Sequence, residues 1–398
     1  MNDRLIYLDN AATTFPKPRE VLEEMLETYI RIGVSPGRGS YDMAVQAEEI
    51  VYEKRKQLAV FFGAPDPNRV IFTANATDAL NLIFAGLLQP GDHVVSTRLE
   101  HNSVLRPLHH FHERSGVTYD LVSFDSRGFV DPQEIERSIK PNTRCVVVTH
   151  ASNVLGTVQP APEIGKVCAD RGIPFIVDAS QSAGTIPIDM MAWHVSALAF
   201  TGHKALYGPT GIGGLVLHPE MDIGASRFGG TGVDSKSLVH TSSYPHRLES
   251  GTINLMGIIG LSAGIDYILK KGMPSIHRQE MALLNRLRDG LAELKHVRLY
   301  GDDDLSNHVA VLSANVEGMS SRDVGDILDG DFNIAVRVGL HCAPLVHRDL
   351  GTINSGAVRF SLGVFNTQED IDQAIRAMAS MRTYSTGFGK RPQAANQQ

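Results

Sequence analysis

Short apolar segments alternate with segments of helical periodicity through the first two-thirds of the chain. Two helices come first, at residues 18–32 and 45–62, where apolar residues recur every three or four positions. Predicted strands then lie at 70–73, 93–96, 117–124, 145–149, 173–178, 197–201 and 213–217, with helices at 78–87, 102–114, 132–139 and 163–171 between the earlier ones. Several of these strands are apolar throughout, as is typical of parallel strands covered by helices on both faces. The pattern predicts an α/β fold built on a mostly parallel sheet.

After residue 254 the pattern changes. Two long helices, at 255–271 and 274–294, precede strands near 309–314, 335–338 and 357–362 and a last helix at 368–382. We therefore expect a large domain over residues 16–254 and a smaller α+β domain that combines residues 1–15 with residues 255–383. The polar segment 384–398 has no periodicity and is expected to be a disordered tail.

Composition excludes several classes of protein. The 398 residues carry a net charge of −7, so no basic field is available to attract nucleic acid or an anionic membrane. No apolar run approaches the length of a membrane span, and the first residues lack the apolar core of a secretion signal. Three cysteines are too few for a disulfide scaffold, and they fit a reducing compartment. We expect a cytoplasmic protein.

Two ionisable residues stand at the ends of predicted strands, where open α/β sheets bind their ligands. Asp178 ends the strand at 173–178, and Lys204 is the only Asp, Glu, Lys or Arg between residues 190 and 219. Asp178 could equally cap a helix, and the Lys204 side chain could extend to water. A buried lysine is, however, a candidate amine nucleophile. Together the pair indicates a pyridoxal-phosphate (PLP) site, which needs a Schiff-base lysine and an acid beside the pyridine nitrogen.

Donors for a phosphate group occur in two segments. Ala76 and Thr77 begin a predicted helix and can offer backbone N–H groups and a hydroxyl, although Thr77 alone would also fit an ordinary helix cap. Thr201 and His203 can close the other side. The glycine-rich segment 208–214 precedes a strand rather than a helix and so fails as a dinucleotide-binding loop.

A cluster of histidines lies on one predicted helix. His109, His110 and His112, followed by Glu113, share this helix, and the sequence offers no second cluster of ligands. We therefore predict no metal site.

Motifs along nearly the whole chain resemble those of the class V aminotransferase group of fold-type I PLP enzymes, in its cysteine desulfurase and selenocysteine lyase branch. They are YLDNAATT (7–14), EHNS (100–103), SNVLG (152–156), VDASQ (177–181), TGHK (201–204), ESGT (249–252), GLHCA (339–343), RFSLG (359–363) and Asn366-Thr367. The resemblance implies the fold of that group and PLP as the cofactor. It also implies a homodimer with shared active sites.

The resemblance further implies a role for each matching residue. Lys204 would form the Schiff base, Asp178 would pair with the pyridine nitrogen, Gln181 would bind the ring hydroxyl, and His101 would stack on the ring and move protons. Thr77, Thr201 and His203 would hold the phosphate, and Thr252 would reach the phosphate in the neighbouring subunit. Arg359 would bind the substrate carboxylate, with Asn153 beside substrate and cofactor. A structural ion pair is the alternative for Arg359.

Cys342 decides between reactions, because the class V family also contains aminotransferases. Cys145 and Cys168 lie in apolar segments and are expected in the core, whereas Cys342 lies in a Gly/Pro-flanked segment near Arg337, His347 and Arg348. Positive neighbours favour the nucleophilic thiolate. We expect a cysteine desulfurase that converts L-cysteine to L-alanine with a persulfide on Cys342 and passes the sulfur to an acceptor protein.

Three alternatives stay open at this point. The substrate could be L-selenocysteine, the reaction could be another class V reaction such as transamination, or the chain could be a non-enzymatic PLP-binding protein. The last is disfavoured by the complete set of Lys204, Asp178 and Arg359. Leu340 stands where the related desulfurases that carry Arg-x-Gly-His-His-Cys-Ala have a histidine, which leaves the identity of an acceptor protein undefined.

Overall fold

The computed structural model describes residues 4–37, 39–233 and 235–387. Its α-helices are α1 (Arg19–Ile32), α2 (Asp42–Phe61), α3 (Ala76–Leu87), α4 (Asn102–Ser115), α5 (Pro132–Ser138), α6 (Ala161–Asp170), α7 (Leu255–Lys271), α8 (Met273–Ala292), α9 (Ser321–Phe332), α10 (Pro344–Asp349) and α11 (Gln368–Gly387). Its strands are β1 (Ile6–Tyr7), β2 (Val70–Thr73), β3 (His93–Thr97), β4 (Thr118–Val122), β5 (Thr143–Thr149), β6 (Phe175–Asp178), β7 (Ala197–Thr201), β8 (Gly213–Leu217), β9 (Val297–Tyr300), β10 (Val311–Val316), β11 (Ile334–Ala335), β12 (Arg337–Gly339) and β13 (Ala357–Ser361).

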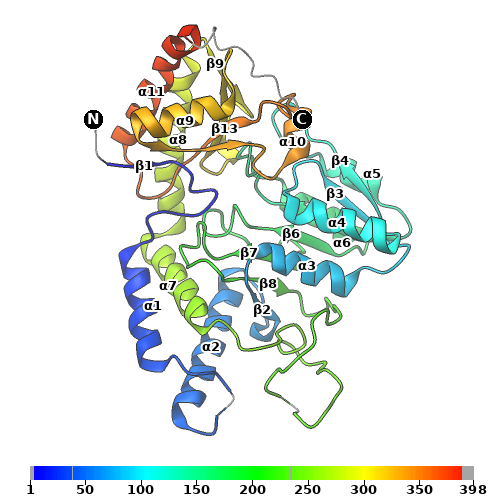
Figure 1. Ribbon diagram of the computed structural model, residues 1–398. Coiled ribbons are helices and arrows are strands. Elements are labelled where there is room, and N and C mark those ends of the chain that lie inside the picture. Colours follow the sequence, from blue (N-terminus) through cyan, green and yellow to red (C-terminus); the bar gives the residue numbers. More distant parts are fainter. Residues whose placement is uncertain (1–3, 38, 234, 388–398) are drawn as a thin grey trace, which may run out of the picture.

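A seven-stranded sheet forms the larger half of the molecule, with strand order β2-β8-β7-β6-β5-β3-β4. Strands β4, β3, β5, β6 and β7 pair in parallel, and β8 runs antiparallel to both of its neighbours. Helices α3 and α4 lie on one part of the sheet in Figure 1, while α1 and α2 both pack against α7. The predicted α/β fold with a mostly parallel sheet is confirmed.

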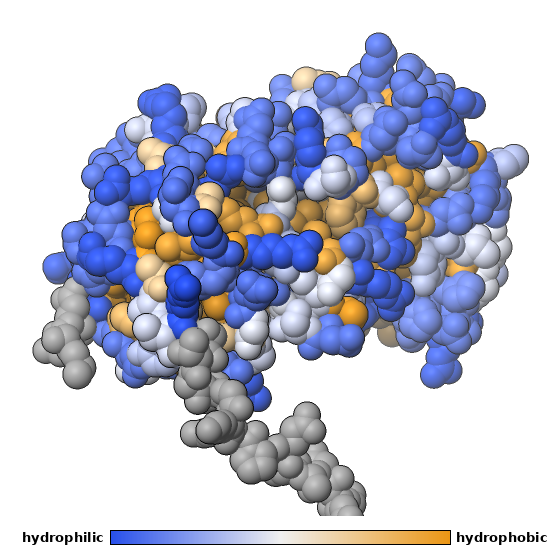
Figure 2. Space-filling view, turned by 90° about the horizontal axis from the view of Figure 1, so that it is seen from above, coloured by the Kyte–Doolittle hydropathy of each residue, from blue (hydrophilic) through white to orange (hydrophobic). Residues whose placement is uncertain are grey.

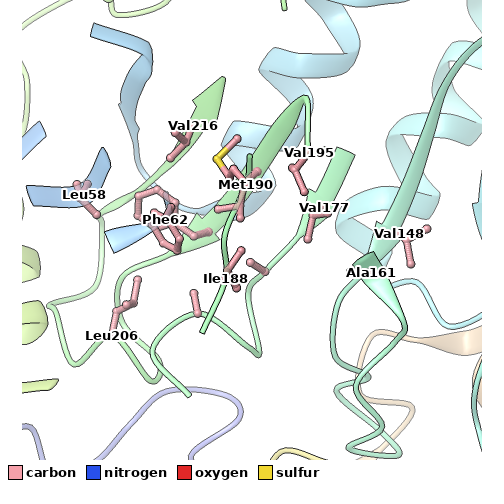
Figure 3. Close-up of a cluster of buried hydrophobic side chains, with 14 of the residues drawn as sticks. Leu58, Phe62, Val148, Ala161, Val177, Ile188, Met190, Val195, Leu206 and Val216 are labelled. Atoms are coloured by element: carbon pink, nitrogen blue, oxygen red, sulfur yellow. The ribbon is translucent and has the colours of Figure 1, made fainter. Parts of the chain in front are cut away.

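The largest hydrophobic core lies between this sheet and its helices. Figure 3 shows Phe62, at the end of α2, beside Leu58, Leu206 and Val216. The ring of Phe62 lies 5.1 Å from that of Phe200 on β7. Strands β6, β7 and β8 are buried along their full length. The sheet is therefore a rigid support for the residues at its carboxyl edge.

A second sheet has strand order β12-β13-β10-β9 and is antiparallel throughout. A separate hydrophobic core packs it against α8, α9 and α11, which lie together at the top of Figure 1. The N-terminal segment joins this half, because β1 pairs in parallel with β11. This pairing places the segment near residue 6 in the same half of the molecule as the segment near residue 334.

The element boundaries agree closely with the prediction in several places. The strands at 70–73, 197–201 and 213–217 and the helix at 255–271 have the predicted bounds. Helix α9 and strand β9 were not predicted. Helix α11 continues to Gly387, so the first four residues of the predicted tail are helical, and residues 388–398 lie outside the described part of the chain.

Seen from above, the molecule shows a band of hydrophobic residues bordered by hydrophilic ones (Figure 2). Such a mixture is ordinary for a folded protein, because polar side chains cannot cover the whole surface. Within the described ranges, no helix is both long and apolar enough to cross a membrane.

Candidate active site

A cavity of about 260 Å³ opens at the carboxyl edge of the parallel strands, between the two sheets. Asp178 ends β6, Thr201 ends β7, and Arg359 reaches the cavity from β13 of the second sheet. The predicted site residues that line it together are Ala76, Thr77, His101, Asn153, Asp178, Gln181, Thr201, His203, Lys204, Cys342 and Arg359. Thr252 does not line it. Residues from seven separate segments therefore converge on one space.

One end of the cavity is suited to an anion. Ala76 and Thr77 are the first residues of α3 and line the cavity, and the first N–H groups of a helix have no partner within it. Asn75 caps the helix by accepting from Asp78 N at 2.9 Å. Thr201 Oγ1 and His203 Nδ1 are buried and have no hydrogen-bond partner among the described residues. Buried polar groups without partners are costly, so these atoms are poised to bind a ligand. The donor set fits a phosphate group.

The close packing of this end depends on a glycine. A Cβ on Gly213 would lie 2.7 Å from the Phe200 carbonyl oxygen and 2.8 Å from Asn75 Cα. Both contacts are with backbone, which cannot move aside. Gly213 thus lets β8 approach the residue that caps α3.

Lys204 and Asp178 form the charged centre of the cavity. Burial lowers the pKa of Lys204 to about 8, while Asp178 opposes part of that shift. Asp178 is 2% exposed, and Ser180 donates to its Oδ1 through both its backbone N–H and its hydroxyl. These bonds fix the carboxylate so that it faces the cavity. A lysine amine and an oriented acid are the two groups that a PLP ring requires.

His101 is held as a neutral ring. Its Nδ1 accepts a hydrogen bond from Ser103 N at 3.0 Å, so the ring caps α4. Burial lowers the pKa of His101 to about 4. Because Nδ1 accepts, the ring proton sits on Nε2, where it can be donated into the cavity.

Arg359 is fully buried and has two partners. Its Nη2 lies 2.7 Å from Asp9 Oδ1, and its Nη1 donates to the Asn153 carbonyl oxygen at 3.1 Å. Its Nε has no partner among the described residues. A guanidinium carries five N–H donors in a fixed plane, so Arg359 keeps donors free for a carboxylate.

Cys342 lies in the short loop between β12 and α10, half-buried, with its Sγ 3.5 Å from Arg337 Nη2. Its backbone is left-handed, with φ of 58°, and that of His341 has φ of 49°. The carbonyl of Cys342 accepts from Asn102 N at 2.7 Å. The loop is therefore anchored to the start of α4 and presents the thiol to the cavity.

The other two cysteines differ from Cys342. Cys145 and Cys168 are completely buried, and burial raises the pKa of each thiol to about 12. Both belong to hydrophobic cores, as predicted from their apolar surroundings in the sequence.

Thr252 is exposed and lies at a second cavity, of about 180 Å³. Its segment is fixed by Glu249, which forms a buried bidentate ion pair with Arg55 and accepts from Phe72 N at 2.6 Å. The motif ESGT thus combines an anchor with an exposed threonine.

Two residues at the site were not identified as site residues from the sequence. Arg337, named there only as a positive neighbour of Cys342, lines the cavity and contacts the thiol. Asp9 binds Arg359. Asp9 lies within the motif YLDNAATT, which is the signal that could have identified it.

The model of the family "Aminotransferase class-V" matches residues 6–374. The chain belongs to this family. Two curated relatives within it are each named "Probable cysteine desulfurase". The protein from Methanothermobacter thermautotrophicus is 36% identical over 372 residues, 92% of each chain. The protein from Pyrococcus abyssi is 37% identical over 379 residues, 94% of this chain and 93% of the relative.

A solved structure is similar along the whole fold. The apo structure of a cysteine desulfurase from Thermococcus onnurineus has a TM-score of 0.90 and 37% identity, covering 96% of this chain and 95% of that one. Class V aminotransferases are PLP-dependent, and the anion-binding end, the lysine and the oriented acid fit that cofactor.

Proposed function

We propose that this protein is a PLP-dependent cysteine desulfurase, which converts L-cysteine to L-alanine and holds the sulfur as a persulfide on Cys342. The observation that carries the proposal is the position of Cys342: its thiol shares one cavity with Lys204 and Arg359 and contacts Arg337. An aminotransferase needs no thiol at this point. The names of the relatives and of the similar structure support the same reaction.

The cofactor would be held by the residues described above. Ala76, Thr77, Thr201 and His203 would bind its phosphate, Asp178 its pyridine nitrogen, Gln181 its ring hydroxyl, and His101 its ring face. Lys204 would bind it covalently as a Schiff base. PLP, when bound, supplies an electron sink that makes the substrate Cα proton acidic.

Arg359 and Asn153 would orient the substrate. The free donors of Arg359 bind the substrate carboxylate, and Asn153, whose carbonyl already accepts from Arg359, lies beside it. Lys204 then takes the Cα proton. Its lowered pKa suits this role, because about a tenth of an amine with a pKa of about 8 is neutral at pH 7, far more than of an ordinary lysine. The neutral ring of His101 can donate from Nε2.

Cys342 would perform the sulfur transfer. Its thiolate attacks the substrate sulfur, so that a new S–S bond forms while the bond between sulfur and Cβ breaks. The electron pair of the broken bond remains with the carbon skeleton, and a proton adds to Cβ to give the methyl group of alanine. The substrate sulfur is oxidised to the persulfide level as Cβ is reduced, and no external oxidant is needed. L-selenocysteine fits the same chemistry.

The surface supports a homodimer. Helix α1 carries a row of exposed apolar residues, Leu22, Leu26, Tyr29 and Ile30, and Tyr52 of α2 is also exposed. We propose that a second copy covers them and that Thr252 reaches the phosphate in the partner's cavity. The persulfide would pass to an acceptor protein, which suits the reducing cytoplasm that we propose for this enzyme.

The two sheets with their separate cores support a two-domain organisation. We propose residues 16–254 as the large domain and residues 1–15 with 255–383 as the small one. The cavity then lies between domains, which is a common position for a ligand site.

Replacing Cys342 tests the proposed function. The Cys342→Ala variant should keep the bound cofactor yet lose sulfide and alanine production from cysteine. Cys168→Ala is the matched control and should keep its turnover, since Cys168 is buried in the core. Full turnover by Cys342→Ala would overturn the proposal.

A further inference from the structure

A chain of three buried side chains lies directly behind the Cys342 loop. His341 Nδ1 is 3.2 Å from His347 Nε2, and His347 Nδ1 is 2.8 Å from Thr352 Oγ1. The other ring nitrogen of His341, Nε2, is 3.3 Å from the carbonyl oxygen of Arg337. All three side chains are at most 3% exposed. The proposed reaction does not use His347 or Thr352, so their arrangement needs another explanation.

The direction of these hydrogen bonds follows from the atoms at the two ends. The carbonyl of Arg337 can only accept, so His341 Nε2 carries the proton and His341 Nδ1 must accept. His347 Nε2 therefore donates to His341, and His347 Nδ1 accepts from the Thr352 hydroxyl. That hydroxyl also lies 3.3 Å from the His347 carbonyl, but its contact with His347 Nδ1 is shorter, at 2.8 Å, and this nitrogen has to accept. Every donor thus has one acceptor, and both rings are neutral.

The pKa directions agree with this assignment. Burial lowers the pKa of His341 to about 2 and that of His347 to about 4. Neutral rings can each donate one proton and accept another, which a continuous chain requires. The chain therefore keeps its direction at the pH of the cell.

The chain ends on the residue that contacts the thiol. The main chain of Arg337 accepts from His341, and the guanidinium of Arg337 donates to Cys342 Sγ. In the turn that leads from Arg337 to Cys342, the backbone is left-handed at both His341 and Cys342. Non-glycine residues adopt this conformation only when their surroundings hold it. Asn153 Nδ2 also donates to the His341 carbonyl, at 2.7 Å. The ring of His341 is thus one of the few contacts that fix the strained turn.

We infer that His347 is a positioning residue for sulfur transfer: acting through His341, it holds the loop from Arg337 to Cys342 so that the thiol meets the substrate sulfur. Thr352 fixes the ring of His347 in the same chain. The inference rests on the proposed function, because it assigns the chain to the step that Cys342 performs. It assigns no role in carboxylate binding or in proton removal at Cα.

Two reactions of the holoenzyme separate these steps. Exchange of the Cα hydrogen of L-alanine for solvent deuterium, followed by NMR, requires Lys204 and Arg359 but not Cys342. Alanine formation from L-cysteine requires all three. His347→Leu should lower kcat for alanine formation at least tenfold, leave KM for cysteine within about twofold, and leave Cα exchange within about twofold.

Three further variants complete the test. His347→Gln keeps a donor near the position of Nε2 and should recover at least half of the lost rate. Thr352→Val is a milder change, because it removes only the hydroxyl. It should show an intermediate loss of kcat for alanine formation, with Cα exchange again little changed. His93→Leu is the matched control: His93 is also buried and pairs through Nδ1 with Thr143 Oγ1 at 2.8 Å, but at the opposite end of β3. It should lose stability without a selective loss of sulfur transfer.

Hydrogen exchange gives a readout that is independent of activity. In His347→Leu without cofactor, the amide of Asn102, which donates to the Cys342 carbonyl, should exchange at least tenfold faster, and it should be unchanged in His93→Leu.

The inference is overturned if alanine formation and Cα exchange fall equally in His347→Leu and in Thr352→Val, or if the Gln variant recovers nothing. A fully active Cys342→Ala enzyme would instead overturn the proposed function. The Asn102 amide would then still report whether His347 holds the loop.

Discussion

Asp9 Oδ1 lies 2.7 Å from Nη2 of Arg359, and the two residues are 350 positions apart in the sequence. Arg359 is completely buried, so an unpaired guanidinium there would be costly. Asp9 therefore neutralises the arginine and fixes its plane before substrate arrives. The carboxylate-binding arginine depends on the N-terminal segment for its orientation.

Asp9→Asn should weaken substrate binding more than turnover. The amide keeps the shape of the side chain but not its charge, so Arg359 loses its fixed orientation. We expect KM for cysteine to rise about tenfold, equivalent to about 1.4 kcal/mol, with kcat little changed. Asp372→Asn, which removes an exposed ion pair with Arg286, is the control. An unchanged KM in Asp9→Asn would show that Asp9 does not orient the arginine.

Lys204→Ala should abolish the absorbance of the lysine-bound cofactor. The control is Lys17→Ala, because burial also lowers the pKa of Lys17 to about 8, yet this amine donates to the His203 carbonyl and does not line the cavity. Absorbance spectra of the two purified variants should differ clearly. Persistence of the lysine-bound band in Lys204→Ala would place the Schiff base on another lysine.

Mixed dimers test whether Thr252 acts across the interface. Thr252→Asp should repel the phosphate, and Lys204→Ala removes the Schiff base, so each homodimer should be inactive. If Thr252 serves the partner's site, each hybrid dimer contains one site in which both residues are natural. An equimolar mixture of the two variants should then regain roughly a quarter of the natural activity. If Thr252 serves its own site, every site in a hybrid carries one defect. No activity in purified hybrids would therefore contradict the shared site.

Glu280 should make the protein less stable as the pH rises. Burial raises the pKa of this carboxyl to about 8 from an ordinary value of 4.5. Between these values the unfolded chain releases the proton while the folded protein keeps it. The free energy of unfolding therefore falls by about 1.4 kcal/mol per pH unit and levels off above about pH 8.

Glu280→Gln removes this term while keeping the shape of the side chain. From pH 6 to pH 8, urea unfolding should show the variant gaining about 2 kcal/mol relative to the natural protein. The exposed Glu317→Gln should show no such gain. Parallel pH profiles for Glu280→Gln and the natural protein would mean that Glu280 is ionised in the folded state.

The sequence predicted the layout of the large sheet because its strands are continuous apolar runs. Buried β6, β7 and β8 are readily distinguished from amphipathic helices. The antiparallel direction of β8 could not be predicted from the apolar pattern, because strand direction depends on the path of the chain rather than on composition. Helix α9 was missed because its sequence contains two glycines and four aspartates, which have low helix propensity.

The sequence could indicate which residues lie together at the cavity where their position follows from local structure. Asp178 and Lys204 follow buried strands, so their position at the carboxyl edge could be inferred directly, and the resemblance added Arg359 and Cys342. Neither Asp9 nor His347 follows a buried strand, and although Asp9 lies within a matching motif, the sequence does not show that it meets Arg359. Asp9 contacts Arg359 only because the segment after β1 forms a bridge, at Asp9, with Ser361 at the end of β13. The ring of His347 meets His341 only through the turn into α10.

The central claim is that Cys342 receives the substrate sulfur, and mass spectrometry of the enzyme during a single turnover tests it most directly. With cysteine limiting and no acceptor added, the peptide that contains Cys342 should gain the mass of one sulfur atom for each alanine formed, and the peptides of Cys145 and Cys168 should gain none. Stoichiometric alanine without added sulfur on the Cys342 peptide would contradict the account.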